Sequence, residues 1–488
     1  MINYFEFGKH ANRSELPSLK WSPDSKDTQN PHMLICGSSG AGKTRLLKKI
    51  VSYLAENKKH IFMFDLKGDM KIKDYNGNDI GNYIDLTAWD SEFGINPFEF
   101  DTGIPLTELE EIISGEKPTK EQYFKLRNSG PQVQVSRFIE IIKKNFLPNM
   151  GTAQKDVLNF ILSDTYVASG FAYNNPKTWN CELPSLINTQ ELIKKILAAF
   201  NGNSDSNSGD FDVQTGEFIL EIRKNSLAIK SLEEREKSGD IDNGEDIKNK
   251  IKTLSTKNES LLRGYVEHSK ETYTPTDNLT AYDWIAEKGV DFDKYQNKSV
   301  IKTLEKLSSY INALVESGVF HSKKPPVKSG LNVINVSGLD VTIQRFIVDV
   351  WIGKVFKSCK IRGEYQDLPN KTRGEKCDTY IVIDESKLVA GTARDKNDPY
   401  SYLSRIATEA RSYGLALVVG SQSAEHFPVE FLKNFASQII MKTAEADSDT
   451  ARKSFGVEKQ LLEFTRQQQG NTLIRIDRKF SKIKLSSD

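Results

Sequence analysis

The sequence predicts an α/β protein in which a large, mainly helical insertion interrupts one parallel sheet. Two observations predict the sheet: short apolar runs occur early in the chain, at 33–36 and 61–64, and again late, at 331–336, 380–383 and 415–419. Such runs, separated by helical patterns, are typical of strands buried on both faces of a parallel sheet. The third observation is the middle of the chain, where helical periodicity replaces these runs.

Composition indicates a soluble globular protein. Hydrophobic residues make up 38% of the 488 residues, which is enough for packed cores. The 67 Lys and Arg residues nearly balance the 66 Asp and Glu residues, so any contact with nucleic acid must be local. We expect a cytoplasmic protein with no membrane partner, because the sequence has no signal segment and no apolar run of about 18 residues.

The cysteines and histidines do not indicate a disulfide framework or a zinc site. The six histidines form no pair at metal-ligand spacing, and no CxxC pair occurs among Cys36, Cys181, Cys359 and Cys377.

We expect the chain to be divided into a lead-in, a discontinuous core and an insertion. Residues 1–30 form the lead-in, residues 31–100 and 331–488 form the core, and residues 101–330 form the insertion. The polar segment NGNSDSNSGD predicts a mobile loop at 201–210.

Apolar residues repeat every seven positions in two parts of the insertion, at 220, 222, 227 and 229 and at 247, 254 and 261. This spacing fits a protruding helical hairpin, and it fits two ordinary helices equally well, because each repeat spans few heptads. Such a hairpin could dock a partner or cover the core as a lid.

The strongest motif is the glycine-rich segment GSSGAGKT, which follows an apolar strand and precedes a helical pattern. This is the P-loop pattern, in which backbone N–H groups and a helix N-terminus bind phosphate oxygens. Lys43 would contact the β and γ phosphates, and Thr44 would ligate Mg²⁺. The predicted nucleotide-binding residues are Gly37, Ser38, Ser39, Gly40, Ala41, Gly42, Lys43, Thr44 and Arg45.

A second motif is an apolar strand at 379–383 that ends in Asp384 and Glu385. Such a strand can place Asp384 near Mg²⁺ through a water molecule, and Glu385 near the water that attacks the γ phosphate. Alone, two acidic residues after a strand can mark a solvated loop. Together with the P-loop they predict an ATP-hydrolysing site.

The order of the downstream elements resembles the HerA/FtsK superfamily of P-loop ATPases. The segment EARSYG leads into a strand that ends in Ser421 and Gln422, and further similarities occur at 64–69, 95–98, 435–455 and 470–485. The resemblance implies a RecA-like (ASCE) P-loop NTPase core. It also implies that Arg411 is an arginine finger acting on a neighbouring subunit and that Gln422 senses the γ phosphate; a surface arginine and a turn glutamine are the alternatives.

Two features depart from the family pattern. Residues 1–30 stand where HerA relatives usually carry an N-terminal β-barrel, and Ser386 follows the acidic pair where helicase relatives often have Ala-His or Ala-Gln. The second departure puts the family's coupling between hydrolysis and DNA in doubt for this chain.

The resemblance implies an ATP-dependent and Mg²⁺-dependent hexameric ring that translocates or unwinds double-stranded DNA. A nuclease or another effector is the expected partner, in DNA processing or anti-phage defence. An ATP-dependent assembly platform that recruits an effector is the alternative, and a membrane secretion ATPase is a third, weaker one. Phosphate contacts are expected from Lys387, Arg394 and Lys396, although nearby aspartates also fit a solvated loop; no base-reading motif is visible, so binding should not depend on DNA sequence.

Overall fold

The computed structural model describes most of the chain as two compact units. The described residues are 3–486 except 12, 14, 75, 89–90, 92, 101, 105, 202–220, 222–223, 226–227, 230–231, 233–243, 269–274, 322, 370, 372–373, 386–401, 424–426, 428 and 477–478. The first unit comprises residues 1–151, 173–186 and 312–488, and the second comprises residues 152–172 and 187–311. The domain limits expected from the sequence stay a prediction.

Three expectations fall outside the described residues. They are the loop of Lys387, Arg394 and Lys396, all of the 201–210 loop except residue 201, and most of the repeat at 220–229.

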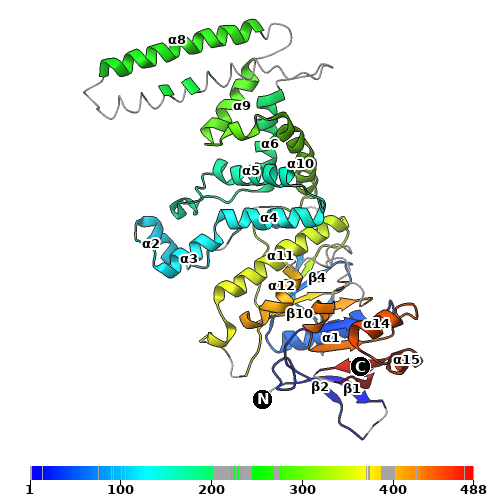
Figure 1. The fold of residues 1–488 in the computed structure, drawn as a ribbon. Coiled ribbons are helices and arrows are strands. Elements are labelled where there is room, and N and C mark those ends of the chain that lie inside the picture. Colours follow the sequence, from blue (N-terminus) through cyan, green and yellow to red (C-terminus); the bar gives the residue numbers. More distant parts are fainter. Residues whose placement is uncertain are drawn as a thin grey trace. The chain divides into compact units, whose positions relative to one another are not determined.

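The first unit is built on an eleven-stranded sheet in the order β2-β1-β13-β12-β11-β3-β10-β9-β4-β8-β7. Figure 1 labels β1, β2, β4 and β10 of this sheet. Its strands are β1 (Phe5–His10), β2 (Leu19–Trp21), β3 (Met33–Cys36), β4 (His60–Asp65), β7 (Asn82–Asp85), β8 (Leu331–Asn335), β9 (Thr379–Ile383), β10 (Leu415–Ser421), β11 (Ser437–Ile440), β12 (Asn471–Arg475) and β13 (Ser481–Leu485). The seven strands from β11 to β7 are parallel. The predicted α/β class is therefore confirmed.

The central strands are mainly apolar, and helices cover both faces of the sheet. On one face, Leu47, Ile50 and Leu54 of α1 (Lys43–Glu56) pack in one core with Ile35, Met63, Val382 and Val418 of the strands. On the other face, Phe62 and Phe64 contact Trp351 of α11 (Val341–Arg362), with ring centroids 6.4 and 6.2 Å apart. All of these side chains are at least nine-tenths buried.

The strand order fixes which chain segments meet at one edge of the sheet. β10 lies between β3 and β9, pairing Ser421 with Cys36 and Val419 with Ile383. β4 lies on the other side of β9, pairing Phe64 with Ile383. Because parallel strands end at the same edge, the segments that follow β3, β4, β9 and β10 come together there.

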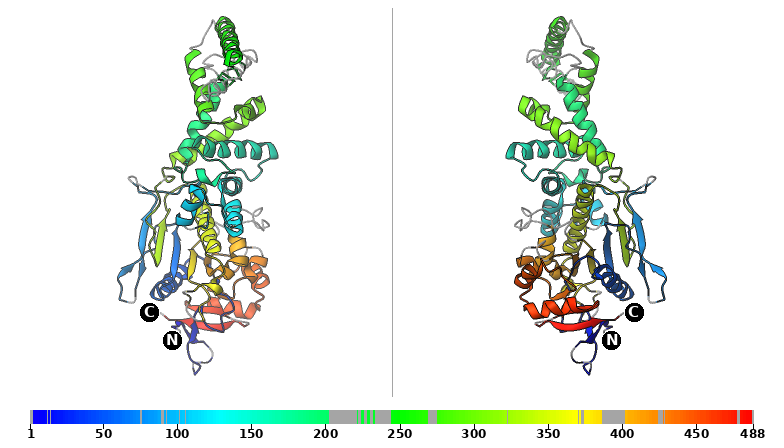
Figure 2. Two further views of the ribbon diagram at one scale, coloured as in Figure 1. Left: turned by 90° about the vertical axis from the view of Figure 1, so that its left-hand side faces the viewer. Right: turned by 90° about the vertical axis from the view of Figure 1, so that its right-hand side faces the viewer.

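The chain's two ends form an antiparallel extension of the sheet, in which β1 pairs with β13 (Figure 2). The strands β1 and β2 lie in the segment for which the sequence predicted only a lead-in. Trp21, at the end of β2, donates from Nε1 to Ser437 Oγ at 3.0 Å, a buried hydrogen bond. The sequence missed these strands because they are short and half-polar.

The described part of the first unit has further elements. They are β5 (Ile72–Lys73), β6 (Asp79–Ile80), α2 (Leu106–Ser114), α3 (Lys120–Ser129), α4 (Pro131–Asn145), η1 (Pro176–Thr178), η4 (Tyr365–Asp367), α12 (Tyr402–Glu409), η7 (Ala410–Tyr413), α13 (Val429–Lys433), α14 (Ser448–Phe455) and α15 (Lys459–Gln467). Of these, β5 and β6 form a separate two-stranded sheet.

The described part of the second unit is helical. It contains α5 (Thr152–Ala168), α6 (Leu186–Asn201, whose first residue belongs to the first unit), α8 (Gly244–His268), α9 (Pro275–Glu287), η3 (Phe292–Tyr295) and α10 (Lys298–Glu316), whose last turn belongs to the first unit. A buried carboxylate joins two of these elements: Asp164 of α5 accepts from Tyr295 Oη at 2.7 Å and from Lys294 Nζ at 3.0 Å. Burial raises the pKa of Asp164, although both partners oppose that shift.

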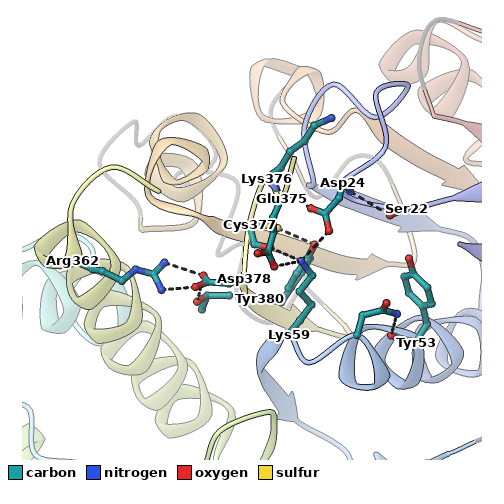
Figure 3. Close-up of polar contacts among 12 residues, drawn as sticks. Ser22, Asp24, Tyr53, Lys59, Arg362, Glu375, Lys376, Cys377, Asp378 and Tyr380 are labelled. Atoms are coloured by element: carbon teal, nitrogen blue, oxygen red, sulfur yellow. Dashed lines mark hydrogen bonds and ion pairs between the residues drawn. The ribbon is translucent and has the colours of Figure 1, made fainter. Parts of the chain in front are cut away.

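A polar network stabilises the amino ends of the central strands (Figure 3). Lys59, almost completely buried, bonds to Glu375 at 2.6 Å and to Asp24 at 3.0 Å. Arg362 makes a bidentate pair with Asp378 at 2.6 and 2.9 Å. These contacts tie the loop before β9 to α11 and to the loop after β2.

Candidate nucleotide-binding site

The P-loop connects β3 to α1 through a tight glycine turn. Gly40 and Gly42 have φ angles of 75° and 93°, a left-handed conformation that residues with a Cβ rarely adopt. A Cβ on Gly37 would lie 2.9 Å from the Cβ of Met441, so this position has no room for a side chain. The spacing of glycines therefore has a local structural cause at each of these positions.

The amino terminus of α1 points its positive end at this turn. The helix begins at Lys43, and it has neither a side-chain N-cap nor an acidic residue in its first turn. An anion placed there would meet backbone N–H groups and the favourable end of the helix dipole. Of the other expected nucleotide-binding residues, Ser39 and Arg45 are exposed, and Ala41 is half-buried.

The loop after β11 holds the P-loop from one side. Ser38 donates to the carbonyl oxygen of Lys442 from both its backbone N, at 2.7 Å, and its Oγ, at 3.0 Å. On the other side, Gly37 N donates to Ser421 O at 3.1 Å. The turn is thus fixed by both strands that flank β3.

Lys43 is buried beneath the turn. Its Nζ donates to the carbonyl oxygen of Ser38 at 3.0 Å, and 7% of the residue is exposed. Burial lowers the pKa of Lys43, while the nearby carboxylates of Asp384 and Glu385 act in the opposite direction.

Thr44 and Asp384 meet at the end of the sheet. Thr44 Oγ1 donates to Asp384 Oδ2 at 2.5 Å, and the carboxylate is buried. Gly420, on the intervening strand β10, makes this position possible: a Cβ there would lie 2.5 Å from Asp384 Oδ1. The sequence predicted that these two motifs act together, and the structure brings them into contact.

Glu385 has a strained backbone and a restrained side chain. Its φ angle is 60°, which is uncommon for any residue other than glycine, asparagine or aspartate. Its Oε1 accepts from Gln422 Nε2 at 2.7 Å and pairs with Lys67 Nζ at 3.0 Å. Burial would raise the pKa of Glu385, but the hydrogen bonds from Gln422 and Lys67 outweigh it and lower that pKa.

The oxygen donors at this edge fit a magnesium ion, because Mg²⁺ prefers hydroxyl, carboxylate and water oxygens. Thr44 would ligate it directly and Asp384 through a water molecule, while Lys43 and the start of α1 would bind phosphate groups. A bound Mg²⁺ would neutralise charge on the β and γ phosphates.

Arg411 does not join this cluster. It lies in η7, directly before β10, whereas Gln422 lies directly after the same strand. The seven residues of β10 place the two at opposite edges of the sheet, about 20 Å apart. Arg411 is exposed and makes no ion pair within the described part of the chain, although its charge lowers the pKa values of His32 and Lys376.

Sequence reasoning missed two residues of this site. Lys67 was noted only as part of a segment that resembles the family, and no role was assigned to it. No role was assigned to Gly420 either, although a glycine directly before the polar end of a buried strand indicates close approach of another group.

Comparison with known protein families decides the chain's membership. A family model described as "Helicase HerA, central domain" matches residues 5–355. The chain belongs to this family. The expected membership of the HerA/FtsK superfamily is therefore confirmed.

Solved structures extend this comparison. VirB4 of Thermoanaerobacter pseudethanolicus is similar with a TM-score of 0.58 and 12% identity, covering 99% of this chain and 96% of that one. The bacterial conjugative coupling protein TrwBΔN70 has a TM-score of 0.45 and 12% identity, and the match covers 99% of this chain and 89% of that one. B204, the DNA-packaging ATPase from Sulfolobus Turreted Icosahedral Virus, has a TM-score of 0.24 and 16% identity, and the match covers 32% of this chain and 68% of that one. The likeness to VirB4 supports a RecA-like P-loop ATPase fold.

A search of curated proteins found no matching sequence. Within the described residues, every helix is too short or too polar to cross a membrane.

Proposed function

We propose that the chain is an ATP-hydrolysing motor that forms a ring and translocates or unwinds double-stranded DNA. The observation that carries this proposal is the contact between Thr44 and Asp384, beside a Glu385 held by Gln422. It makes the P-loop and the acidic strand end one composite site, and both halves are needed for hydrolysis.

Each residue of the site has a role that its position supports. Lys43 and the amino terminus of α1 bind the phosphates, and Thr44 and Asp384 hold Mg²⁺. Glu385 orients the attacking water and accepts its proton, and Gln422 reports the state of the γ phosphate through its bond to Glu385. In this proposal Arg411 acts on a neighbouring subunit, because it lies at the edge opposite its own P-loop.

We propose DNA as the substrate because the description of the matching family names a helicase. We propose a hexameric ring in the cytoplasm, with Lys387, Arg394 and Lys396 contacting DNA phosphates independently of sequence. A nuclease or another effector would use the motor in DNA processing or anti-phage defence.

An ATPase assay tests this function directly. Wild type and Glu385→Gln are compared with and without duplex DNA, together with native mass measurement. Wild type should hydrolyse ATP as a hexamer and faster with DNA, and Glu385→Gln should bind ATP but lose about 100-fold or more in rate. Glu463→Gln, at an exposed glutamate of α15, is the matched control and should behave as wild type.

Two results would contradict the proposal. Normal hydrolysis by Glu385→Gln would remove the proposed mechanism. Hydrolysis that is unchanged by DNA of any length, in a stable ring, would instead favour the assembly platform.

A further inference from the structure

A second lysine, Lys67, reaches the acidic pair from the loop that follows β4. Its Nζ lies 3.0 Å from Glu385 Oε1, the oxygen that also accepts from Gln422. The side chain of Glu385 is 13% exposed, whereas that of Lys67 is 48% exposed. The lysine therefore contacts a half-buried carboxylate from the solvent side of the site.

The backbone around Lys67 is fixed by one buried carboxylate. Asp65, the last residue of β4, accepts from the backbone N–H groups of Lys67, Gly68 and Asp69 at 3.1, 2.7 and 3.3 Å through Oδ1. Its Oδ2 accepts from Met70 N at 3.0 Å. A loop held by four such bonds keeps the Cα of Lys67 in place, so movement is confined to its side chain.

The position of this loop follows from the strand order. β4 pairs directly with β9, and Phe64 lies opposite Ile383, so the segments that follow the two strands are neighbours. On the other side of β9, Gln422 follows β10 and reaches the same carboxylate. Glu385 is thus held from both neighbouring strands, by a cation on one side and an amide on the other.

Lys67 and Gln422 both donate to Oε1 of Glu385. These two contacts compete with any hydrogen bond between that oxygen and a water molecule. An ammonium group on a half-exposed, four-carbon side chain can exchange its partner for a nearby anion of higher charge. The terminal phosphate of ATP is such an anion, and ADP lacks it.

We propose that Lys67 is a positioning residue that holds Glu385 and moves to the terminal phosphate when ATP binds, which leaves Glu385 bound by Gln422 alone. This inference rests on the proposed ATPase function. Lys67 is then the residue that discriminates between a nucleoside triphosphate and a diphosphate at this site.

Equilibrium binding tests the inference without relying on turnover. The full chain is titrated with Mg²⁺ and either ADP or a non-hydrolysable ATP analogue, by calorimetry, for wild type, Lys67→Ala, Lys67→Arg and Lys71→Ala. Lys71 is an exposed lysine of the same loop. Lys67→Ala should weaken binding of the analogue about tenfold and change ADP binding less than about twofold, as expected for one lost charge-assisted hydrogen bond. Lys67→Arg should retain most of the selectivity, and Lys71→Ala should match wild type.

Two outcomes would overturn the inference while leaving the ATPase function intact. Equal weakening of both nucleotides would mean that Lys67 only supports the loop, and unchanged affinity for both would mean that it does not meet the phosphate. If Lys67→Ala does not fold, Lys67→Gln, which keeps most of the side-chain length, decides between the same results. If wild type binds neither nucleotide, the ATPase proposal itself fails.

Discussion

Thr44 and Asp384 are 340 residues apart in the chain, and a 2.5 Å hydrogen bond joins their side chains. Thr44 is the last residue of the P-loop motif, and Asp384 is the first residue after β9. The parallel sheet makes this contact possible, since β3 and β9 flank β10 and end at the same edge. The two halves of the candidate site therefore exist as one unit only in the folded chain.

Removing the hydroxyl of Thr44 should weaken Mg²⁺-dependent nucleotide binding. Thr44→Val keeps the shape of the side chain but takes away the proposed Mg²⁺ ligand and a partner of the buried Asp384 carboxylate. We expect about tenfold or greater loss of affinity for ATP in the presence of Mg²⁺, measured with a fluorescent analogue. Thr44→Ser keeps the hydroxyl and should bind nearly as wild type. Equal binding by the valine variant would exclude Thr44 as a metal ligand.

Gly420→Ala tests the position of Asp384 from the neighbouring strand. The added Cβ would lie 2.5 Å from Asp384 Oδ1, so the carboxylate must move. A shift of about 1 Å in a catalytic group can reduce the rate about 100-fold, so ATP hydrolysis should fall by this order. Gly151→Ala, where a Cβ would meet no atom within 4 Å, is the control for adding a methyl group. Full activity of Gly420→Ala would show that Asp384 does not need its observed position.

Mixed rings test whether Arg411 acts on the neighbouring subunit. Arg411→Ala and Lys43→Ala should each abolish hydrolysis alone, because one lacks the finger and the other the phosphate-binding lysine. In a mixture, some interfaces combine an intact P-loop with an intact Arg411, so part of the activity should return. The rate is measured over a series of mixing ratios.

Arg452→Ala provides the comparison for this experiment. Arg452 is an exposed arginine of α14 whose contact with Asp449 spans 4.0 Å. The variant should be fully active alone. Undiminished hydrolysis by pure Arg411→Ala rings, or no recovery in any mixture, would disprove the assignment.

The sequence was sufficient to predict the central part of the fold because local signals and the global arrangement agree there. The apolar runs at 33–36, 61–64 and 380–383 all became buried central strands. The P-loop glycines could be recognised because their backbone angles and close contacts fit few residues other than glycine. The pairing of Thr44 with Asp384 could be inferred from chemistry, since both motifs serve the same ion.

The other features depend on tertiary contacts that leave little trace in the sequence. β1 and β2 are short, half-polar strands, and their place is set by pairing with β13 at the far end of the chain. Lys67 is an ordinary exposed lysine until the strand order places β4 beside β9. Its contact with Glu385 therefore could not be predicted from spacing or composition.

His32 should make the stability of the protein depend on pH. This residue precedes β3 and is 1% exposed, and its Nδ1 accepts from Leu417 N at 3.0 Å. Burial, and to a lesser extent the charge of Arg411, lowers its pKa from 6.5 to about 4. The ring is therefore neutral in the folded chain at a pH where the unfolded chain would protonate it.

The sign of the effect follows from that difference. The stabilising contribution is present above pH 6.5, where neither state binds the proton, and it is lost as the pH falls towards about 4, because only the unfolded chain gains a proton in that interval. The loss should reach about 3 kcal/mol at the acidic end. His32→Asn can still accept from Leu417 N but cannot titrate, so its thermal midpoint should fall less than that of wild type between pH 7.5 and pH 5. An equal fall in both proteins would mean that His32 is not the group responsible.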